Sequence, residues 1–461
     1  MARVNPFIFR TYDIRGKALT ELTEEACLLI GKAFGSTVRE LYGKEHPTLA
    51  VGRDMRTHSP QLKSALVAGL VSTGCTVLKI GETPTPTNYF TICDRQLDGG
   101  LQITASHNPK EDNGIKLQIR DAAAFAGEDI QRLRERIERG DFLTGKGSEE
   151  TIDAVGPYLH FLQKEFGRCG EGLTVAIDTG NGATGPVCLR AFESAGAKVI
   201  GLYLDPDGTF PNHPADPSKT ATLRELRETV VEREAHIGFG FDGDGDRVGL
   251  VDERGQIRTA DETLLLLARE YLRKFPGAAI VFTTSMSSTL ETEIRKWDGK
   301  PVMCAVGHSI VEHEMKRTGA PLGGEQSGHF FLADRAHGYD DALIVALELL
   351  TILREAQQPC SALFADFPKV YHAEELRLGC PDSEKTRIVR AITAHFRKEY
   401  PVDTTDGARI DFSDGAWANI RQSNTSPLLS VCMEARSEEK LATMQKIIVA
   451  HLKTHPEITW K

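Results

Sequence analysis

The chain has 461 residues, which is too long for one ordinary hydrophobic core and predicts three or four domains of roughly 100 to 150 residues each. Hydrophobic residues make up 40% of the chain and charged residues 26%, the composition of a globular protein. The net charge of −10 argues against general nucleic-acid binding, which needs a basic face, so a phosphorylated ligand would require a local basic pocket.

The nine cysteines are odd in number and scattered, with no CxxC pair, so they predict neither a disulfide framework nor a zinc site. The first residues, MARVNPFIFR, lack the apolar core of a signal peptide, and no apolar run reaches membrane-spanning length. We therefore expect a soluble, cytoplasmic protein that binds neither nucleic acid nor a membrane.

Apolar runs typical of strands alternate with segments of helical periodicity over most of the chain. TLAVG at 48–52 precedes a helix-like segment at 59–74, and the pattern restarts with LTVAID at 173–178 and with AAIVFTT at 278–284. Alternation of strands and helices at this spacing predicts βαβ units and mainly parallel sheets. We count three such α/β modules of similar plan.

The last hundred residues follow a different order. An amphipathic helix is expected at about 383–399, followed by short strands around ARIDF, GAWANIRQS and LLSVCMEARS and by a closing helix. This order predicts a smaller α+β domain with an antiparallel sheet. Polar or proline-bearing junctions place the predicted domains at 1–153, 154–255, 256–367 and 368–461.

The first candidate site is ITASHNPKEDNGIK, residues 103–116. It begins as a buried strand and then sets Ser106 beside His107 and Asn108. Three polar residues at a strand end fit either a simple turn or a nucleophile held at the edge of a sheet. Neighbouring side chains on an extended chain point opposite ways, so we expect His107 to point away from Ser106. No Ser-His-Asp arrangement or nucleophile elbow is apparent.

The second candidate site is FDGDGDRVG, residues 241–249. Asp242, Asp244 and Asp246 alternate with glycines that let the backbone fold so that the three carboxylates converge. Such carboxylates repel one another unless a cation lies between them, and oxygen ligands suit Mg²⁺ or Ca²⁺. A solvated acidic turn is the alternative.

An EF-hand loop would use the same three aspartates. However, Arg247 stands where that loop needs glycine for its sharp turn, and the flanks HIGFGF and VGLVDE have the pattern of strands, not helices. A three-carboxylate site also leaves the cation open for a phosphate oxygen.

GNGATG, residues 180–185, matches the GxGxxG pattern of dinucleotide-binding proteins through Gly180, Gly182 and Gly185. It follows a predicted strand and opens a helix, and Asp205 lies downstream after a second strand. A nicotinamide-dependent oxidoreductase is therefore an alternative function. The motif lies in the second module, not at the start of a complete dinucleotide-binding unit, which favours an ordinary tight turn.

Two later loops have the polar groups that a sugar phosphate requires. GGEQSGH at 323–329 alternates Glu325, Ser327 and His329, and a carboxylate is a natural partner for sugar hydroxyls. In RQSNTSP at 421–427, a guanidinium fork stands with hydroxyl and amide donors, which is what a phosphate dianion needs. An ordinary loop and a helix cap are the respective alternatives.

Taken together, these motifs resemble the α-D-phosphohexomutase family over the whole chain. The resemblance rests on FRTYDIRG near the start, TASHNP with the downstream NGIK, DGDGDR, GGEQSGH and RQSNTSP, in this order. It implies four domains around a central cleft: three related α/β modules with mixed sheets and a C-terminal α+β domain. It also implies an enzyme that moves phosphate between the 1- and 6-positions of a hexose through a phosphoserine and a bisphosphorylated sugar.

The resemblance also implies roles for individual residues. Ser106 would carry the phosphoryl group, and Asp242, Asp244, Asp246 and one phosphoserine oxygen would hold Mg²⁺. The groups expected to neutralise charge or move protons are Arg15, Lys116, Arg247, His308 and His329. The groups expected to bind substrate are Tyr12, His107, Asn108, Glu325, Ser327, Arg421, Ser423, Asn424 and Thr425. Glucose 1,6-bisphosphate or mannose 1,6-bisphosphate would act as activator, and the protein would be a monomer or weak homodimer.

The choice of sugar rests on a few positions. SNT in the last loop and His308 after a glycine resemble the phosphomannomutase/phosphoglucomutase branch, whereas GGEQSGH is also frequent in the phosphoglucosamine branch. Two lysines frequent in the hexose branch are absent here, in TTSMSS and at Glu312. Phosphoglucosamine mutase therefore stays an alternative, as does a non-catalytic phosphosugar-binding protein.

Overall fold

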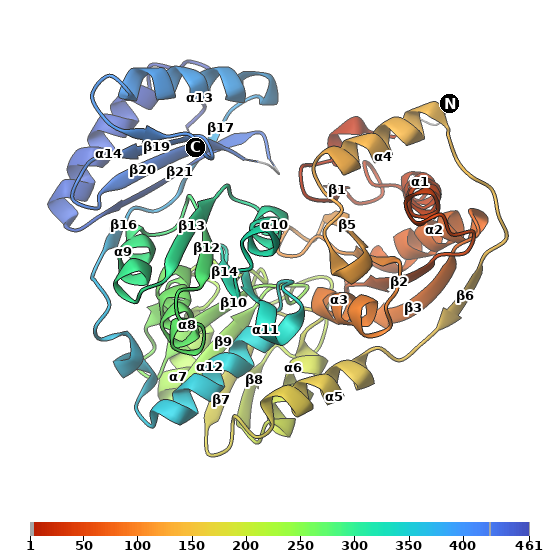
Figure 1. The fold of residues 1–461 in the computed structure, drawn as a ribbon, viewed down its shortest axis with the longest axis horizontal. Helices are drawn as coiled ribbons and strands as arrows, with labels where there is room; N and C mark the ends of the chain where they lie inside the picture. The colour runs from red at the N-terminus through yellow and green to blue at the C-terminus, as the bar shows by residue number, and fades with distance from the viewer. Residues whose placement is uncertain (1–3, 424–425, 461) are drawn as a thin grey trace. The chain divides into compact units, whose positions relative to one another are not determined.

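The computed structural model describes residues 4–423 and 426–460. The chain forms two compact units, one made of residues 1–263 and 327–364 and the other of residues 264–326 and 365–461 (Figure 1). Among the described residues, no helix combines the length and the apolar character needed to cross a bilayer. Every cysteine is a free thiol, and all but Cys93 are buried.

The first sheet of the first unit has the order β1-β5-β4-β2-β3-β6. Strands β4, β2, β3 and β6 run parallel, whereas β5 is antiparallel to both β4 and β1, so the sheet is mixed. Its strands are β1 (Ile14–Lys17), β2 (Thr48–Arg53), β3 (Thr76–Glu82), β4 (Gly99–Ile103), β5 (Asp112–Ile119) and β6 (Ser148–Thr151).

Helices α1 (Glu24–Tyr42), α2 (Ser59–Ser72), α3 (Thr85–Asp94) and α4 (Glu128–Arg139) accompany this sheet. The start of α1 is fixed by Thr23, whose hydroxyl accepts a hydrogen bond from Ala26 N, and its end by Gly43 in the left-handed conformation. Apolar residues of α1 and α2 pack together and against the sheet in one continuous core.

The second sheet has the order β11-β10-β9-β7-β8 and is also mixed, because β7 is parallel to β8 and β9 while β10 is antiparallel to β9. Its strands are β7 (Thr174–Asp178), β8 (Lys198–Leu202), β9 (Ile237–Phe241), β10 (Val248–Asp252) and β11 (Ile257–Arg258). The nearby helices are α5 (Val155–Phe166), α6 (Gly185–Ser194), α7 (Arg224–Glu232) and α12 (Ala342–Ala356). The first unit also contains β15 (Phe330–Leu332) and α11 (Ala333–Ala336).

The second unit holds a sheet in which β12 (Ala279–Thr283) pairs in parallel with β13 (Lys300–Cys304) and β14 (Leu322–Gly324). Helices α9 (Ser288–Lys296) and α10 (His308–Thr318) connect these strands, and α8 (Ala260–Lys274) precedes them.

The C-terminal sheet of the second unit is antiparallel throughout, with the order β16-β21-β20-β19-β18 and β17 also paired with β21. Helices α13 (Asp382–Phe396) and α14 (Glu438–Leu452) accompany it. The strands are β16 (Tyr371–His372), β17 (Leu376–Gly379), β18 (Val402–Asp403), β19 (Ala408–Asp411), β20 (Trp417–Gln422) and β21 (Leu428–Ala435). The predicted fold class, three α/β modules followed by an α+β domain, is confirmed; the four domain boundaries stay predictions.

Candidate active site

Ser106 lies three residues beyond β4, a strand whose five residues are all buried. Its backbone has φ 52°, in the left-handed region, and its N–H donates to Thr104 Oγ1 at 2.9 Å. Ser106 Oγ is 3.1 Å from His107 Nδ1. The expectation that His107 points away is therefore wrong, because it assumed extended backbone at a residue that turns.

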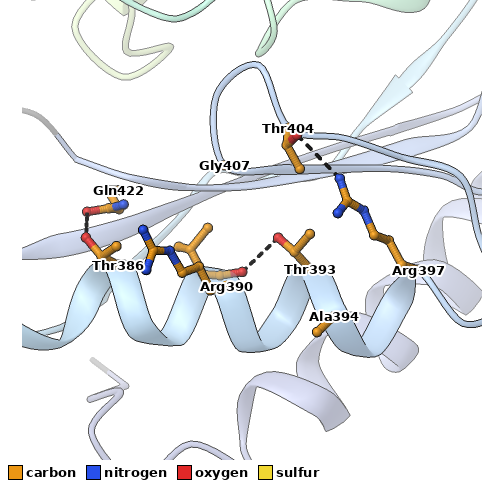
Figure 2. A pocket seen from close by; sticks show the side chains of 9 residues that line it. Thr386, Arg390, Thr393, Ala394, Arg397, Thr404, Gly407 and Gln422 are labelled. Carbon is orange, nitrogen blue, oxygen red and sulfur yellow. Dashed lines mark hydrogen bonds between the residues drawn. The ribbon is translucent and has the colours of Figure 1, made fainter.

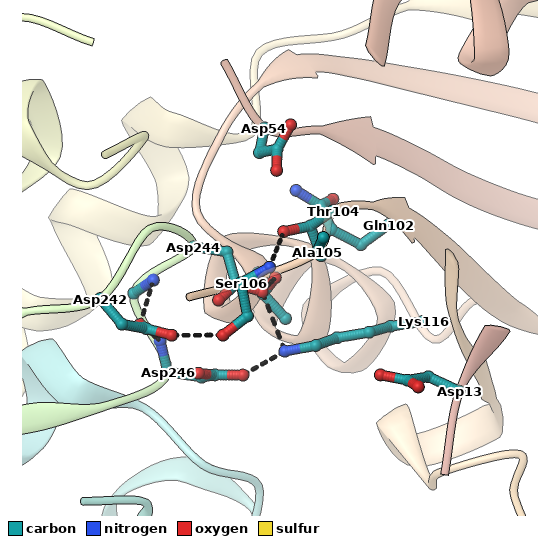
Figure 3. A network of polar contacts seen from close by, with 12 residues as sticks. Asp13, Asp54, Gln102, Thr104, Ala105, Ser106, Lys116, Asp242, Asp244 and Asp246 are labelled. Carbon is teal, nitrogen blue, oxygen red and sulfur yellow. Dashed lines mark hydrogen bonds and ion pairs between the residues drawn. The ribbon is translucent and has the colours of Figure 1, made fainter. Parts of the chain in front are cut away.

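The aspartate loop connects β9 to β10, as the strand-like flanks predicted. Asp242 Oδ1 shapes this loop by accepting hydrogen bonds from the N–H groups of Gly245, Asp246 and Arg247 at 2.9, 3.1 and 3.2 Å. The other oxygen, Oδ2, accepts a 2.5 Å hydrogen bond from Ser106 Oγ. The serine loop and the aspartate loop thus meet directly (Figure 3).

Gly243 permits this close approach. A Cβ added at position 243 would lie only 2.5 Å from the carbonyl oxygen of Ser106, which real Cβ atoms do not tolerate. The glycine that the sequence pattern assigned to chain flexibility is therefore also a steric requirement of the contact between the two loops.

The three aspartates form a site suited to a hard divalent cation. Their side chains are at most 1% exposed, and their carboxylate oxygens lie within 4.8 Å of one another. Asp244 Oδ1 is buried without a hydrogen-bond partner among the described residues, which costs free energy unless a cation binds it. Burial and repulsion from Asp246 and Asp244 raise the pKa of Asp242 well above its usual value.

Lys116 brings positive charge to the same place from β5. Its Nζ lies 2.9 Å from Asp244 Oδ2 and also contacts Asp246 Oδ2 (Figure 3). Burial alone would lower the pKa of Lys116, but the two carboxylates raise it well above the ordinary value. Lys116 is therefore a permanently charged partner of the aspartate loop.

Arg15, on β1, supports the other side of the serine loop. Its Nε is 2.7 Å from Asp13 Oδ2, and Nη1 donates to Ala105 O at 3.2 Å and to Asn108 Oδ1 at 2.9 Å. Tyr12, also among the expected substrate contacts, is half-buried just before β1.

Arg247, His329 and Ser327 extend the cluster. Arg247 Nε donates to His329 Nε2 at 3.2 Å. His329 Nε2 also lies 3.4 Å from Asp246 Oδ1. His329 Nδ1 is 2.9 Å from Ser327 Oγ. His329 also forms a group with Asp246 and Asp340 that has the spacing of metal ligands. A histidine fixed at both ring nitrogens thus stands beside the aspartate loop.

The remaining expected residues gather within the second unit. Glu325 Oε1 accepts a 2.7 Å hydrogen bond from Gly307 N, next to His308, the first residue of α10. Asp406 Oδ2 accepts from Val306 N at 3.0 Å and lies 3.8 Å from Arg421 Nη1. These contacts bring together the loop before α10, the loop after β14, the turn between β18 and β19, and Arg421 on β20.

Ser423 is buried and donates its N–H to Leu428 O at 2.9 Å, which closes the loop after β20. The other two expected phosphate contacts, Asn424 and Thr425, lie outside the described residues.

Arg56 was not predicted from the sequence as a site residue, yet its guanidinium group holds the serine loop. Its side chain is 0% exposed. Nη2 donates to Ser106 O at 2.9 Å and to Asn108 O at 2.7 Å, while Nη1 donates to Pro109 O at 2.6 Å and to Asp112 O at 3.0 Å. The signal in the sequence is VGRDMR, where charged residues directly follow an apolar strand.

Asp54 and Thr85 were also missed. Asp54, 1% exposed, neutralises Arg56 with Oδ2 at 3.1 Å from Nε and accepts from Ser59 Oγ at 2.6 Å. Thr85, the first residue of α3, donates from Oγ1 to Asp244 Oδ2 at 2.6 Å and from N to Asp244 O at 2.8 Å. Nothing in the local sequence around Thr85 indicates this contact.

The glycine-rich loop at 180–185 packs against the aspartate loop. Ala183 N donates to Gly243 O at 3.0 Å, and a Cβ at Gly182 would lie 3.0 Å from the same oxygen. Gly182 is explained by this close contact, Gly180 by its left-handed backbone and Gly185 by its contact with Leu204 O, so the structure favours the tight turn over dinucleotide binding.

The two positions that lack lysine have other partners in the second unit. Glu312 is buried and pairs with Lys316 Nζ at 2.6 Å. Arg409, from β19, donates to Met286 O at 3.1 Å and contacts Thr284 O, so a cation from the C-terminal domain reaches the loop after β12.

Models of one protein family match nearly the whole chain. Those described as phosphoglucomutase/phosphomannomutase α/β/α domains I, II and III match residues 6–144, 157–255 and 259–371, and that of the C-terminal domain matches residues 375–451.

Individual relatives agree with the family models. A phosphomannomutase/phosphoglucomutase from Pseudomonas aeruginosa is 38% identical over 447 residues, which cover 97% of this chain and 95% of that protein. A phosphoglucomutase from Neisseria meningitidis serogroup A is 34% identical over the full length of both chains. The crystal structure of a family protein from Burkholderia thailandensis, 35% identical, superposes with a TM-score of 0.90 over 98% of each chain. The chain therefore belongs to the phosphoglucomutase/phosphomannomutase family, within the α-D-phosphohexomutases.

Proposed function

We propose that this chain is an Mg²⁺-dependent phosphosugar mutase that interconverts the 1- and 6-phosphates of mannose, of glucose or of both. The observation that carries the proposal is the 2.5 Å contact between Ser106 Oγ and a buried site of three carboxylates. A serine that carries a phosphoryl group requires such a site, because the transferring group is highly charged. The names of the full-length relatives support the same activity.

Ser106 is the proposed phosphoryl carrier. In the first half-reaction the bond between phosphorus and Oγ breaks while a new bond forms to the free sugar hydroxyl, which gives a bisphosphorylated sugar. In the second, Ser106 Oγ takes the other phosphoryl group and the hydroxyl left on the sugar regains a proton. Bound by Asp242, Asp244 and Asp246, Mg²⁺ would neutralise charge that develops on the phosphoryl oxygens.

The chain's own cations complete this role. Lys116 stands against Asp244 and Asp246, and Arg15 binds the carbonyl and amide oxygens of the serine loop. Since phosphoryl transfer depends on alignment and charge neutralisation more than on covalent chemistry, these fixed groups, with Arg247, are the proposed electrostatic contributors.

A proton must leave the attacking hydroxyl and return later. Within the first unit we assign this role to His329, whose two ring nitrogens are oriented by Arg247 and Ser327. His308 is the corresponding candidate in the second unit. Burial, with the charges of Arg247 and Arg15, lowers the pKa of His107 well below its usual value, so His107 is neutral at pH 7 and suits a phosphate contact.

The proposed sugar and phosphate contacts come from GGEQSGH at 323–329 and from the segment at 421–425. Glu325 and Ser327, which flank Gln326 in GGEQSGH, would accept or donate hydrogen bonds to sugar hydroxyls. Arg421, Ser423, Asn424 and Thr425 would grip the phosphate that is not being transferred. Glucose or mannose 1,6-bisphosphate as activator, a cytoplasmic location and a monomer or weak homodimer complete the proposal.

One set of assays tests the function and the sugar. Purified protein with Mg²⁺ and a trace of bisphosphorylated sugar is given mannose, glucose or glucosamine 1-phosphate, and the 6-phosphate is measured. Turnover of mannose or glucose 1-phosphate is expected. A strong preference for glucosamine 1-phosphate would move the chain to the phosphoglucosamine branch. Absence of turnover together with sugar-phosphate binding would indicate a binding protein, and quenching of NADH fluorescence would indicate an oxidoreductase.

A further inference from the structure

A groove in the C-terminal domain lies between α13 and the turn at 404–407 (Figure 2). Its volume is about 460 Å³, within the range of small-molecule sites, roughly 300–1,000 Å³. The groove is lined by Thr386, Val389, Arg390, Thr393, Ala394, Arg397, Thr404, Gly407 and Gln422. Two of these residues are arginines and none is acidic, although the whole chain carries a net charge of −10.

Both arginines stand on the same face of α13, with Thr393 between them (Figure 2). They are seven residues apart, which places them about 10 Å apart along the helix axis. The Arg390 guanidinium forms no hydrogen bond or ion pair with any residue that the structure describes. Arg397 has only a long hydrogen bond, 3.4 Å from Nη2 to Thr404 Oγ1. The two guanidinium groups therefore have donors available for an anion.

The acidic residues close to the groove are engaged elsewhere. Asp406 Oδ2 accepts a hydrogen bond from Val306 N at 3.0 Å and lies 3.8 Å from Arg421 Nη1. Asp403 Oδ1 accepts from Thr405 N at 2.7 Å. Neither carboxylate lines the groove, so neither neutralises Arg390 or Arg397 there.

The groove is distinct from the phosphate contacts proposed for the loop after β20. Side chains alternate along a strand, so Gln422 faces away from the side on which Arg421 and Ser423 stand. Gln422 Oε1 accepts from Thr386 Oγ1 at 3.1 Å, which places it at the α13 side of the sheet (Figure 2).

We propose that this groove is a second anion-binding site, which takes a linear polyphosphate group, free or as part of a nucleotide, on Arg390 and Arg397. A chain of phosphates can contact both guanidinium groups at once, and each can form bidentate hydrogen bonds with phosphate oxygens. The hydroxyl of Thr404, which accepts from Arg397 Nη2, keeps its own proton as a further donor, and Val389 and Ala394 provide apolar lining. The binding does not depend on the proposed mutase activity.

The test is residue-specific protection from arginine modification. Protein in EDTA is treated with phenylglyoxal with and without inorganic triphosphate, and modified peptides are quantified by mass spectrometry. Triphosphate is expected to protect Arg390 and Arg397, with the same half-saturation in wild type and in Arg421→Gln. Unchanged modification of Arg390 and Arg397, or protection that disappears in Arg421→Gln, would overturn the proposal.

Calorimetry provides the matched control. The double variant Arg390→Gln/Arg397→Gln is expected to bind triphosphate at least about tenfold more weakly, because both sets of charged hydrogen bonds to phosphate oxygens are lost. Arg387→Gln removes one positive charge from α13 outside the groove, where Arg387 pairs with Glu384 at 2.8 Å, and should leave binding unchanged. Equal losses of affinity for triphosphate in both variants would show that only the net charge of the protein matters, which would contradict the proposed site.

The same titration with adenosine triphosphate distinguishes the two sources of the anion. Equal affinity for both compounds would assign the groove to a bare polyphosphate chain, and tighter binding of adenosine triphosphate would assign it to a nucleotide whose base contacts Val389 and Ala394.

Discussion

Ser106 is held by charges that are themselves buried. Arg56 fixes four carbonyl oxygens between Ser106 and Asp112, and Asp54 neutralises the guanidinium. Because desolvated charge is tolerated only when it is paired and hydrogen-bonded, this arrangement has little freedom to relax. The position of Ser106 Oγ against Asp242 is therefore fixed by Arg56 as well as by the aspartate loop.

Ser106→Ala is expected to remove the covalent phosphate and to lower turnover by about 10⁴-fold or more, because the phosphoryl group loses its carrier. Intact-protein mass and the mutase assay provide the two readouts. Ser64→Ala, on the exposed face of α2, is the control and should retain both phosphate and activity. A fully active Ser106→Ala protein would end the assignment.

Arg56→Lys keeps the positive charge beside Asp54. A single ammonium group cannot, however, replace the planar guanidinium that donates to four carbonyl oxygens. We expect kcat to fall by about 10- to 100-fold with a smaller change in KM, since a displaced serine loop affects alignment more than substrate binding. Arg53→Lys is the matched control, because Arg53 pairs with Glu82 outside the serine loop. Equal kinetics of the two variants would contradict a positioning role for Arg56.

At the scale of elements, the candidate site forms beyond the carboxyl ends of β4 and β9, with Lys116 provided by the interior of β5. Thr85, at the start of α3, binds Asp244 through both its backbone N–H and its hydroxyl, so α3 also helps to position the aspartate loop. The two sheets that provide Ser106 and the aspartates belong to the same compact unit. The close approach of the backbone at Gly243 to Ser106 O fixes the distance between the two loops that these sheets carry.

A cluster of histidines lies between α13 and the end of α14. The rings of His395 and His451 stack with centroids 3.8 Å apart, and His455 packs edge-on against His451 at 5.3 Å. His451 Nε2 is buried without a hydrogen-bond partner among the described residues. Burial and the nearby charges of His395 and His455 lower the pKa of His451 to about 4.

This shift has a definite sign. The unfolded chain binds a proton at His451 below its ordinary pKa of about 6.5, whereas the folded chain does so only near pH 4. The contribution of neutral His451 to the free energy of unfolding is therefore fully present above about pH 6.5 and declines as the pH falls from there toward 4. His451→Phe should keep the ring packing and reduce the loss of urea midpoint between pH 7 and pH 5.

His160→Gln, on the exposed face of α5, serves as the control for this measurement and should lose as much stability as wild type on acidification. If His451→Phe shows that same loss, the acid sensitivity of the protein originates outside the α13–α14 contact.

At the scale of the whole molecule, the first unit contains the three buried carboxylates with the orphaned oxygen of Asp244. A cation that binds these groups only in the folded chain stabilises that chain by mass action. Removal of Mg²⁺ with EDTA is expected to abolish turnover, and Mg²⁺ at 100 times its Kd should add about 2.7 kcal/mol to the free energy of unfolding.

Thermal unfolding with Mg²⁺, compared with Na⁺ at equal ionic strength, checks this expectation. Asp244→Asn should lose most of the Mg²⁺-dependent gain in Tm, because the amide removes one anionic ligand. Full activity after chelation, or a gain that Asp244→Asn retains, would contradict a functional cation at these aspartates.

Periodicity and motif order alone were sufficient to predict the fold class and the aspartate cluster. Strands β2, β7 and β12 and helix α13 lie within a few residues of their predicted positions, because alternation and helical period are local properties of the chain. DGDGD likewise gathers three carboxylates through local backbone geometry, so the aspartate cluster was predictable without any knowledge of distant contacts.

Tertiary structure alone decided what surrounds these groups. Arg56 beneath the serine loop, Thr85 on Asp244, Lys116 against Asp244 and Asp246, and the glycine-rich loop against Gly243 all join residues far apart in the chain. The orientation of His107 depended on one backbone torsion, φ 52° at Ser106. Local sequence determines which groups a chain offers, but burial, pairing and direction depend on partners that only folding brings within hydrogen-bond distance.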